Sequence, residues 1–230
     1  MNTVVAPARL LVAAIVVLSA GAVLSAGCVG ESQPPMSFFL TSAGPGDGAN
    51  LGGLAGADAH CEALAMAAGS EGMEWAAYLS TESDSMRAGV NARDRIGSGP
   101  WHNANGVLVA NNVDELHSEA ANLAKETSIS EAGEVINGRG DDPNRHDILT
   151  GSTQDGMAFA ADTLDHTCSV WTSNLSDGSA QVGHHDRTGG GDNPTSWNSA
   201  HPSRGCGQTD LRGTGGDGLF YCFATNTGME

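Results

Sequence analysis

The sequence has few basic residues, few aromatic residues and no long apolar segment after its first thirty positions. Lysine and arginine number 10 against 27 aspartates and glutamates, and Lys125 is the only lysine. A surface this negative repels phosphate backbones, which excludes nucleic acid as a partner. Aromatic residues make up only 5% of the chain, whereas glycine occurs 32 times, so the composition favours a loop-rich fold over a helical bundle. Beyond residue 30, no stretch is long enough to span a membrane.

The sequence also lacks the short motifs that mark common catalytic sites. It contains no HExxH metalloprotease motif, no GxSxG nucleophile elbow and no phosphate-binding P-loop. Paired carboxylates stay open as a catalytic site in so acidic a chain, but no spacing singles out one pair. We therefore expect a protein that is not an enzyme.

The first 27 residues are interpreted as a secretory signal peptide. Arg9 precedes the apolar stretch 10–24, whose length is typical of the hydrophobic region of such signals. The stretch is short for a membrane anchor, and it ends in small residues. Cleavage after Ala22 would release a secreted protein, and this alternative stays open beside the lipoprotein interpretation.

Cys28 lies where a lipoprotein would carry its lipid. The preceding residues 25–27, Ser-Ala-Gly, resemble the lipobox of bacterial lipoproteins, in which small residues precede a lipidated cysteine. Leu24 stands four positions before this cysteine, one more than usual. We expect Cys28 to be lipidated and residues 28–35 to form a tether. This predicts a lipoprotein of the bacterial cell envelope, in the outer membrane where there is one, that touches the membrane only through its lipid anchor.

Four cysteines remain for the folded domain: Cys61, Cys168, Cys206 and Cys222. An even number in an exported chain indicates two disulfides. None is spaced as CxxC, which argues against a zinc ribbon or a thioredoxin-like site. Three pairings are open, and in the nested one Cys61–Cys222 closes nearly the whole domain while Cys168–Cys206 closes a local loop.

Residues 36–225 are expected to form one domain, with a tail at 226–230. The domain begins with one or two helices. One is predicted over 59–68, with Asp58 as its N-cap and Gly69 at its end.

Short strands and long loops follow. Asn105-Gly106 is a strong hairpin signal. Apolar or alternating runs predict strands at 36–41, 75–81, 101–110, 126–137, 168–173 and 218–224. Segments 44–56 and 177–216, rich in glycine and polar residues, are expected to be loops. The expected fold class is α+β.

The cysteine order and three segments resemble the endostatin-like branch of the C-type lectin-like domains. These segments are 50–61 (Asn-Leu-Gly-Gly-Leu-Ala-Gly-Ala-Asp-Ala-His-Cys), 91–96 (Asn-Ala-Arg-Asp-Arg-Ile) and 168–173 (Cys-Ser-Val-Trp-Thr-Ser). The first is similar to bacterial endostatin-like lipoproteins, including those of the leptospiral outer surface. Over 36–225, the resemblance implies a C-type lectin-like fold with the nested disulfides, Cys61–Cys222 tying the first helix to the last strand. It also implies a surface-exposed binding module, since relatives are associated with host matrix or complement ligands.

Binding is expected in the segment 177–216, because recognition concentrates on loops held by a scaffold. The candidate residues are His184, His185, Asp186, Asp192, Asn193, Trp197 and Asn198. Sugar-binding C-type lectins hold calcium with a Glu-Pro-Asn-like and a Trp-Asn-Asp triplet, and the nearest matches here are 142–144 (Asp-Pro-Asn) and 197–199 (Trp-Asn-Ser). A serine in place of the second carboxylate weakens a calcium site, which favours a proline turn and a core tryptophan.

Histidines offer a second kind of site. The run 184–186 (His-His-Asp), with His146, His166 and His201, could gather around zinc, which imidazole and carboxylate suit. Endostatin binds zinc through histidines at its mature N-terminus, and this chain has none between residues 28 and 59. We therefore expect loop histidines bonded to the backbone and no cofactor, with calcium and zinc as alternatives.

The predicted function is a lipid-anchored binding module for an extracellular protein or glycan, without catalysis. A calcium-dependent carbohydrate-binding lectin and a structural envelope protein without a soluble ligand are the alternatives.

Overall fold

The structure, a computed structural model, describes residues 1–3, 33–83 and 88–227. Nearly all of the predicted signal peptide, Cys28 and most of the tether lie outside the described residues. The helices and strands given below belong to one unit that begins at Gln33. In the described part of the chain, no helix is both long and apolar enough to cross a membrane.

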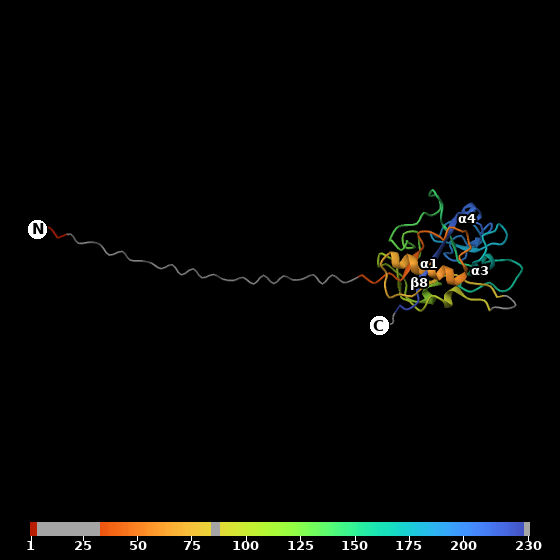
Figure 1. Ribbon diagram of the computed structural model, residues 1–230, viewed down its shortest axis with the longest axis horizontal. Helices are drawn as coiled ribbons and strands as arrows, with labels where there is room; N and C mark the ends of the chain where they lie inside the picture. Colours follow the sequence, from red (N-terminus) through yellow and green to blue (C-terminus); the bar gives the residue numbers. More distant parts are fainter. Residues whose placement is uncertain (4–32, 84–87, 228–230) are drawn as a thin grey trace. The chain divides into compact units, whose positions relative to one another are not determined.

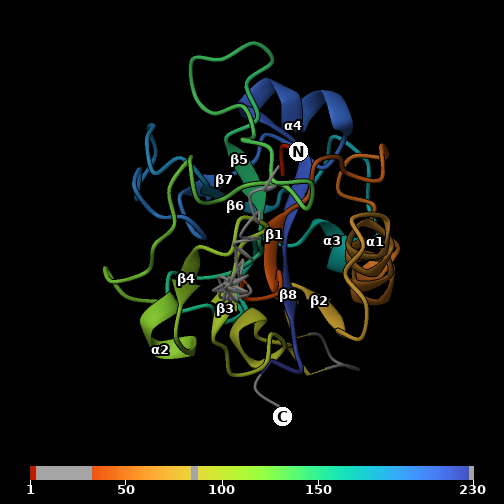
Figure 2. The ribbon, with the colours of Figure 1, turned by 90° about the vertical axis from the view of Figure 1, so that its left-hand side faces the viewer.

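The longest strand, β8 (Gly216–Ala224), lies inside the main sheet, and three other strands pair with it directly (Figure 2). β1 (Phe38–Leu40) pairs antiparallel with one of its edges. On the other edge, β5 (Asp147–Leu149) pairs parallel with its first half and β2 (Trp75–Ala77) pairs antiparallel with its last residues. The sheet then continues outward from β5 through two further strands, β6 and β7.

The remaining elements are short and connect or extend this sheet. They are η1 (Ala92–Asp94), β3 (Trp101–His102), β4 (Leu108–Ala110), α2 (Val113–Leu116), β6 (Gln181–His184), β7 (His201–Pro202) and α4 (Gln208–Thr214). β6 pairs antiparallel with β5, and β7 pairs antiparallel with β6. β3 and β4 form a separate hairpin, as predicted from Asn105-Gly106, with Gly106 in the left-handed region at φ 71°.

Side chains of β8 alternate between two hydrophobic cores. Phe220, Cys222 and Ala224 face the core that also contains the first helix, whereas Tyr221 and Phe223 face the core that contains the β3–β4 hairpin. Successive side chains of a strand point to opposite faces, and a strand buried on both faces is apolar throughout. The predicted strands at 36–41, 75–81 and 218–224 are confirmed in kind, although the first two are shorter than predicted.

The first helix, α1 (Gly53–Ala67, orange in Figure 1), starts six residues earlier than predicted and packs against β2. Its N-cap is Gly52 in the left-handed region at φ 76°, and Asp58 is not a cap. The Asp58 carboxylate instead accepts the Ala77 N–H at 2.9 Å and forms an ion pair with Arg95 at 2.6 Å. The two glycines in 53–58 hid this start, because glycine disfavours helices. The segment is nevertheless helical, and its Ala57 packs in the core.

Both disulfides have the predicted nested pairing. The outer disulfide, Cys61–Cys222, links α1 to β8, and the inner disulfide, Cys168–Cys206, closes a shorter loop. Both have sulfurs buried in the core beside α1. The fold is therefore α+β with two nested disulfides.

The predicted strand at 168–173 is wrong. Residues Cys168–Trp171, labelled α3, form one left-handed helical turn in which all four φ angles lie between 48° and 63°. Trp171 N–H donates to Thr167 O at 2.7 Å, which closes the turn. Distant contacts override the strand propensity of this segment, because Leu51 N–H donates to Trp171 O and the Trp171 indole N–H donates to Ser80 O at 2.8 Å.

The predicted loop at 177–216 is also wrong in part, because it contains β6, β7 and α4. β6 carries no apolar run, since on one of its faces Gly183 meets backbone. A Cβ at Gly183 would lie 1.8 Å from Trp197 O, so only glycine lets this strand approach the segment before β7. Two further predictions are corrected. The loop at 44–56 ends where α1 begins, and the hairpin at 126–137 is reduced to one bridge between Ile129 and Val135.

Candidate functional site

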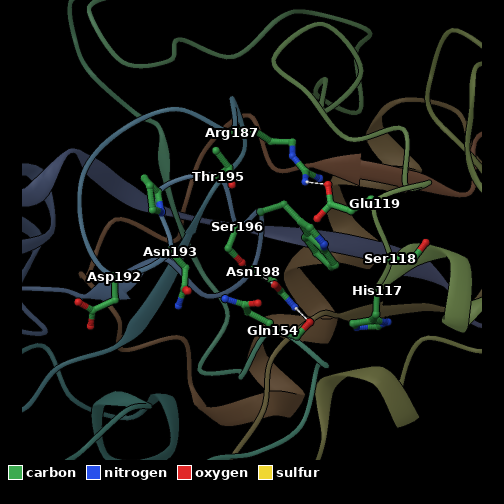
Figure 3. Close-up of a pocket in the computed structure, with 12 residues that line it drawn as sticks. His117, Ser118, Glu119, Gln154, Arg187, Asp192, Asn193, Thr195, Ser196 and Asn198 are labelled. Atoms are coloured by element: carbon green, nitrogen blue, oxygen red, sulfur yellow. Dashed lines mark hydrogen bonds and ion pairs between the residues drawn. The ribbon is translucent and has the colours of Figure 1, made fainter.

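A polar groove of about 490 Å³ lies over the segment that joins β6 to β7 (Figure 3). We call it the polar groove, and it is lined by residues 117–119, Gln154, Arg187 and 192–198. Arg187 and Glu119 point toward each other across it, with 3.5 Å between Nη2 and Oε2. Both side chains keep contact with solvent, and that of Glu119 is 99% exposed. The groove therefore offers both hydrogen-bond donors and acceptors, some of them charged and some neutral.

A buried hydrogen-bond network forms the base of the polar groove. The Asn198 amide donates to Tyr78 Oη at 2.9 Å, and the Tyr78 hydroxyl donates to His117 Nε2 at 2.7 Å. His117 Nδ1 donates to Val113 O at 2.7 Å, which makes its Nε2 the acceptor. Burial lowers the pKa of His117, so the ring stays neutral. Trp197 packs against Tyr78 with 4.8 Å between ring centroids.

Four of the predicted binding residues line this groove: Asp192, Asn193, Trp197 and Asn198. Trp197 and Asn198 are only 4% and 1% exposed, so they shape the groove from below. Asn193 is half-buried, and its amide donates to Ser199 O at 3.2 Å. Asp192 is exposed at the rim.

The other three predicted binding residues, His184, His185 and Asp186, do not line the polar groove. His185 is buried and its Nε2 lies 3.1 Å from Asn137 O. Burial lowers its pKa.

His166, considered at first as a metal ligand, stacks on Phe159 and lies 3.2 Å from an Asp162 oxygen.

His184 belongs instead to a second feature, which we call the histidine cluster: His146, Asp147, His184 and His201. Strand register explains why they meet. Asp147 pairs with His184 across β5 and β6, and His201 of β7 pairs with Val182, which lies on the same face as His184. His146 directly precedes β5, and its ring stacks on His184 with 4.3 Å between centroids.

Three imidazoles surround one carboxylate oxygen in this cluster. The Nε2 atoms of His146, His184 and His201 lie 3.0, 3.4 and 3.6 Å from Asp147 Oδ1. Asp147 is only 2% exposed, and no described residue donates to either of its oxygens with the geometry of a hydrogen bond. A buried carboxylate without donors is costly, so this arrangement calls for a cation or a proton.

Charges around the cluster shift its ionisation. Burial by itself lowers the pKa of His146, but the carboxylates of Asp147 and Asp186 outweigh burial and raise it to about 9. Burial raises the pKa of Asp147, but the adjacent His146 outweighs it, so this pKa lies below its ordinary value. The pKa of Asp186 is also lowered, against its burial, by His146 and by the N–H groups of Arg139 and Thr188. Both carboxylates therefore favour the protonated form of His146.

The two triplets considered for calcium do not assemble into an oxygen site. The Asn198 side chain faces Tyr78, and Asn144 Oδ1 accepts the His146 backbone N–H at 3.2 Å. Within the described ranges, the only group of metal-capable side chains contains His146, Asp147 and His184. Nitrogen ligands suit transition metals rather than calcium.

Sequence reasoning missed Asp147. Its signal was an aspartate immediately before the apolar pair Ile148-Leu149, at the start of a strand that the pattern did not predict. A buried acidic side chain needs a partner, so an aspartate at the start of a buried strand indicates a paired or metal-bound group.

Comparison with known proteins leaves the family open. No protein-family model matches the chain, and no curated protein shows significant sequence similarity to it.

Proposed function

We propose that the protein is a lipid-anchored binding module of the bacterial cell envelope, with a C-type lectin-like fold of the endostatin-like kind. Its polar groove would take a hydroxyl-rich ligand, such as a glycan or a polar segment of an extracellular protein. The disulfide from the first helix to the last strand supports this fold, because it matches the pairing that the resemblance implies.

The observation that carries the proposal is a polar groove on a stiff base. Asn198, Tyr78 and His117 bond to one another beneath it, so its shape is fixed before a ligand arrives. A preorganised site loses less conformational entropy on binding. Ordered binding loops on a disulfide-linked scaffold are a common way to build such a site.

The chemistry of the lining favours a polar, neutral ligand. Arg187 and Gln154 supply donors, Glu119 supplies acceptors, and Thr195 and Ser196 supply hydroxyls that serve as both. A sugar presents many hydroxyls that need such mixed partners. The calcium-dependent lectin remains the alternative, but within the described ranges no group of three or more acidic or histidine side chains gathers around residues 142–144.

The test is a glycan and matrix-protein array probed with the purified chain, in calcium and in chelator. Capture in both conditions is expected. The variant Asn193→Ala/Thr195→Ala should lose capture, because both side chains line the groove. Thr163→Ala, an exposed threonine outside the groove, is the matched control and should retain it.

Three outcomes would contradict the proposal. Capture that disappears in chelator would favour the calcium-dependent lectin. Capture that survives the double variant would place binding elsewhere. The absence of any capture by a folded chain would favour the structural envelope protein.

A further inference from the structure

We propose that the histidine cluster is a binding site for one divalent transition-metal ion of the zinc type. The ligands are Nε2 of His146, His184 and His201 and a carboxylate oxygen of Asp147. Nothing in the proposed groove function requires this ion, and the site stands on its own observations.

The first observation is the buried carboxylate. Asp147 lies in a β-strand at the floor of the cluster, and its side chain is 1% exposed. Neither oxygen accepts a well-formed hydrogen bond from any residue within the described ranges. Buried ionised carboxylates are normally paired or coordinated to metal. The arrangement of the neighbouring rings decides between these two.

The second observation is the direction of the histidine nitrogens. His184 Nδ1 lies 2.8 Å from Pro194 O, and His201 Nδ1 lies 3.0 Å from Pro202 O. A carbonyl oxygen only accepts, so each Nδ1 carries the proton and each Nε2 lone pair points into the cluster. Metal-binding histidines are oriented in this way by a hydrogen bond from the other ring nitrogen.

His146 faces a carboxylate in place of a carbonyl, at ion-pair distance and without a hydrogen bond. Its Nδ1 lies 3.5 Å from Asp186 Oδ1, while its Nε2 faces Asp147. The second Asp186 oxygen accepts the Arg139 backbone N–H at 2.6 Å, so this carboxylate is itself held in place. A carboxylate behind a ligating histidine fixes the ring and increases its basicity.

The spacing of the ligand atoms fits a small ion. Zinc–nitrogen bonds of about 2.0–2.1 Å in a tetrahedron place ligand atoms about 3.3 Å apart. The distances to Asp147 Oδ1 are 3.0, 3.4 and 3.6 Å, and Nε2 of His184 and His201 are 3.0 Å apart. Two lone pairs facing each other at 3.0 Å repel unless a proton or a cation lies between them. His146, Asp147 and His184 form the close group. We assign His201 as the fourth ligand because its Nε2 lies 3.0 Å from that of His184.

The surroundings allow an ion to enter and favour a cation. An open groove of about 610 Å³ is lined in part by His146 and His201 and leads from solvent to the cluster. Glycines pack directly on the rings, since a Cβ at Gly189 or Gly215 would come within 3.0 Å of them. The chain carries a formal net charge of −17, which attracts cations over distance.

A bound ion would join β5, β6 and β7 at one point. It would also fix the start of the segment that lines the polar groove, because Pro194, which accepts from His184, belongs to that lining. The ordinary alternative is a proton-linked pair of His146 and Asp147 without any metal. The two differ in whether the chain takes up zinc at one stoichiometric site.

The experiment titrates zinc chloride into the chelator-treated full chain, carrying no histidine tag, by isothermal calorimetry. One equivalent is expected to bind. His184→Gln should weaken zinc binding by at least about 100-fold, and Asp186→Asn, which leaves every ligand in place, by about 10–100-fold. His185→Gln is the matched control, since it replaces the adjacent buried histidine outside the cluster, and its affinity should stay within about threefold of the parent chain.

Folding of each variant is checked by far-ultraviolet circular dichroism. If His184→Gln does not fold, His201→Gln gives the same test, because the His201 side chain is 21% exposed and tolerates change better. Cobalt(II) provides a second readout, since a four-coordinate nitrogen and oxygen site gives intense visible absorption bands. The proposal is overturned by a folded parent chain that binds no zinc, or by zinc binding that survives in His201→Gln. Equal loss in His185→Gln would overturn it as well.

Discussion

Replacing Ser169 by glycine is expected to stabilise the protein, although glycine in place of another residue usually destabilises. Ser169 is the second residue of the left-handed turn α3, at φ 54° and ψ 51°. In this region the Cβ of an ordinary residue approaches the following carbonyl oxygen, and glycine has no Cβ. The substitution therefore removes the local conformational cost of one residue in the turn.

The expected gain follows from what Ser169 does in the structure. A left-handed residue costs about 1–2 kcal/mol, and the extra entropy that glycine loses on folding costs about 0.5–1 kcal/mol. The side chain is exposed, and its hydroxyl bonds to no described residue. The backbone contacts survive, since the N–H donates to Asp165 and the carbonyl accepts from the Thr172 hydroxyl. The net gain is about 0.5–1 kcal/mol.

The assay is urea or thermal unfolding of the oxidised chain beside a control variant. Ala63→Gly replaces an exposed residue in the middle of α1, where glycine should cost about 0.5–1 kcal/mol. A change of 1 kcal/mol shifts the melting temperature by about 2–4 °C in a domain of this size. The two variants should therefore move it in opposite directions. A loss of stability in Ser169→Gly similar to that in Ala63→Gly would refute the reasoning.

Three further predictions concern the disulfides, the buried histidine network and the anchor. Replacing both cysteines of the outer disulfide by alanine should cost about 5 kcal/mol, and the same change in the inner disulfide about 4 kcal/mol, because the sequence separations are 161 and 38. Denaturant unfolding measures both, and a larger loss for the inner one would contradict loop-closure entropy as the main term. His117, whose pKa burial lowers, is neutral in the folded state, so its contribution to stability is complete above the unfolded pKa of 6.5 and falls as the pH drops below it. His117→Gln should reduce the fall in the free energy of unfolding between pH 7 and 5. An unchanged pH dependence would show that other groups cause this fall. The Cys28→Ser variant should be absent from the membrane fraction of fractionated cells. A variant that is still found there would contradict the lipid anchor.

Some of this architecture is readable from the sequence because it depends on local patterns. The apolar run at the end of the chain predicts β8, since a strand buried on both faces needs apolar residues on both. The hairpin at Asn105-Gly106 follows from turn chemistry. The disulfide pairing came from a resemblance, and the residues alone left three pairings open.

The rest depends on contacts between distant residues. Val170 and Trp171 have strand propensity, yet they form a left-handed turn because Leu51 and Ser80 bind the Trp171 backbone and indole. The histidine cluster has the same origin. His146, His184 and His201 are far apart in the sequence, and only the register of β5, β6 and β7 brings them together. No periodicity in the sequence encodes that register.

The central position of β8 sets the order in which the chain can fold. β1, β2 and β5 all pair with this strand, yet among the described strands it is synthesised last. Until residue 224 is made, the apolar faces of β1 and α1 have no sheet to cover them. Cys61 likewise waits for a partner 161 residues away, while the other two domain cysteines are already present. Nascent chains of this protein are therefore exposed to aggregation and to wrong disulfides until residue 224 has been added.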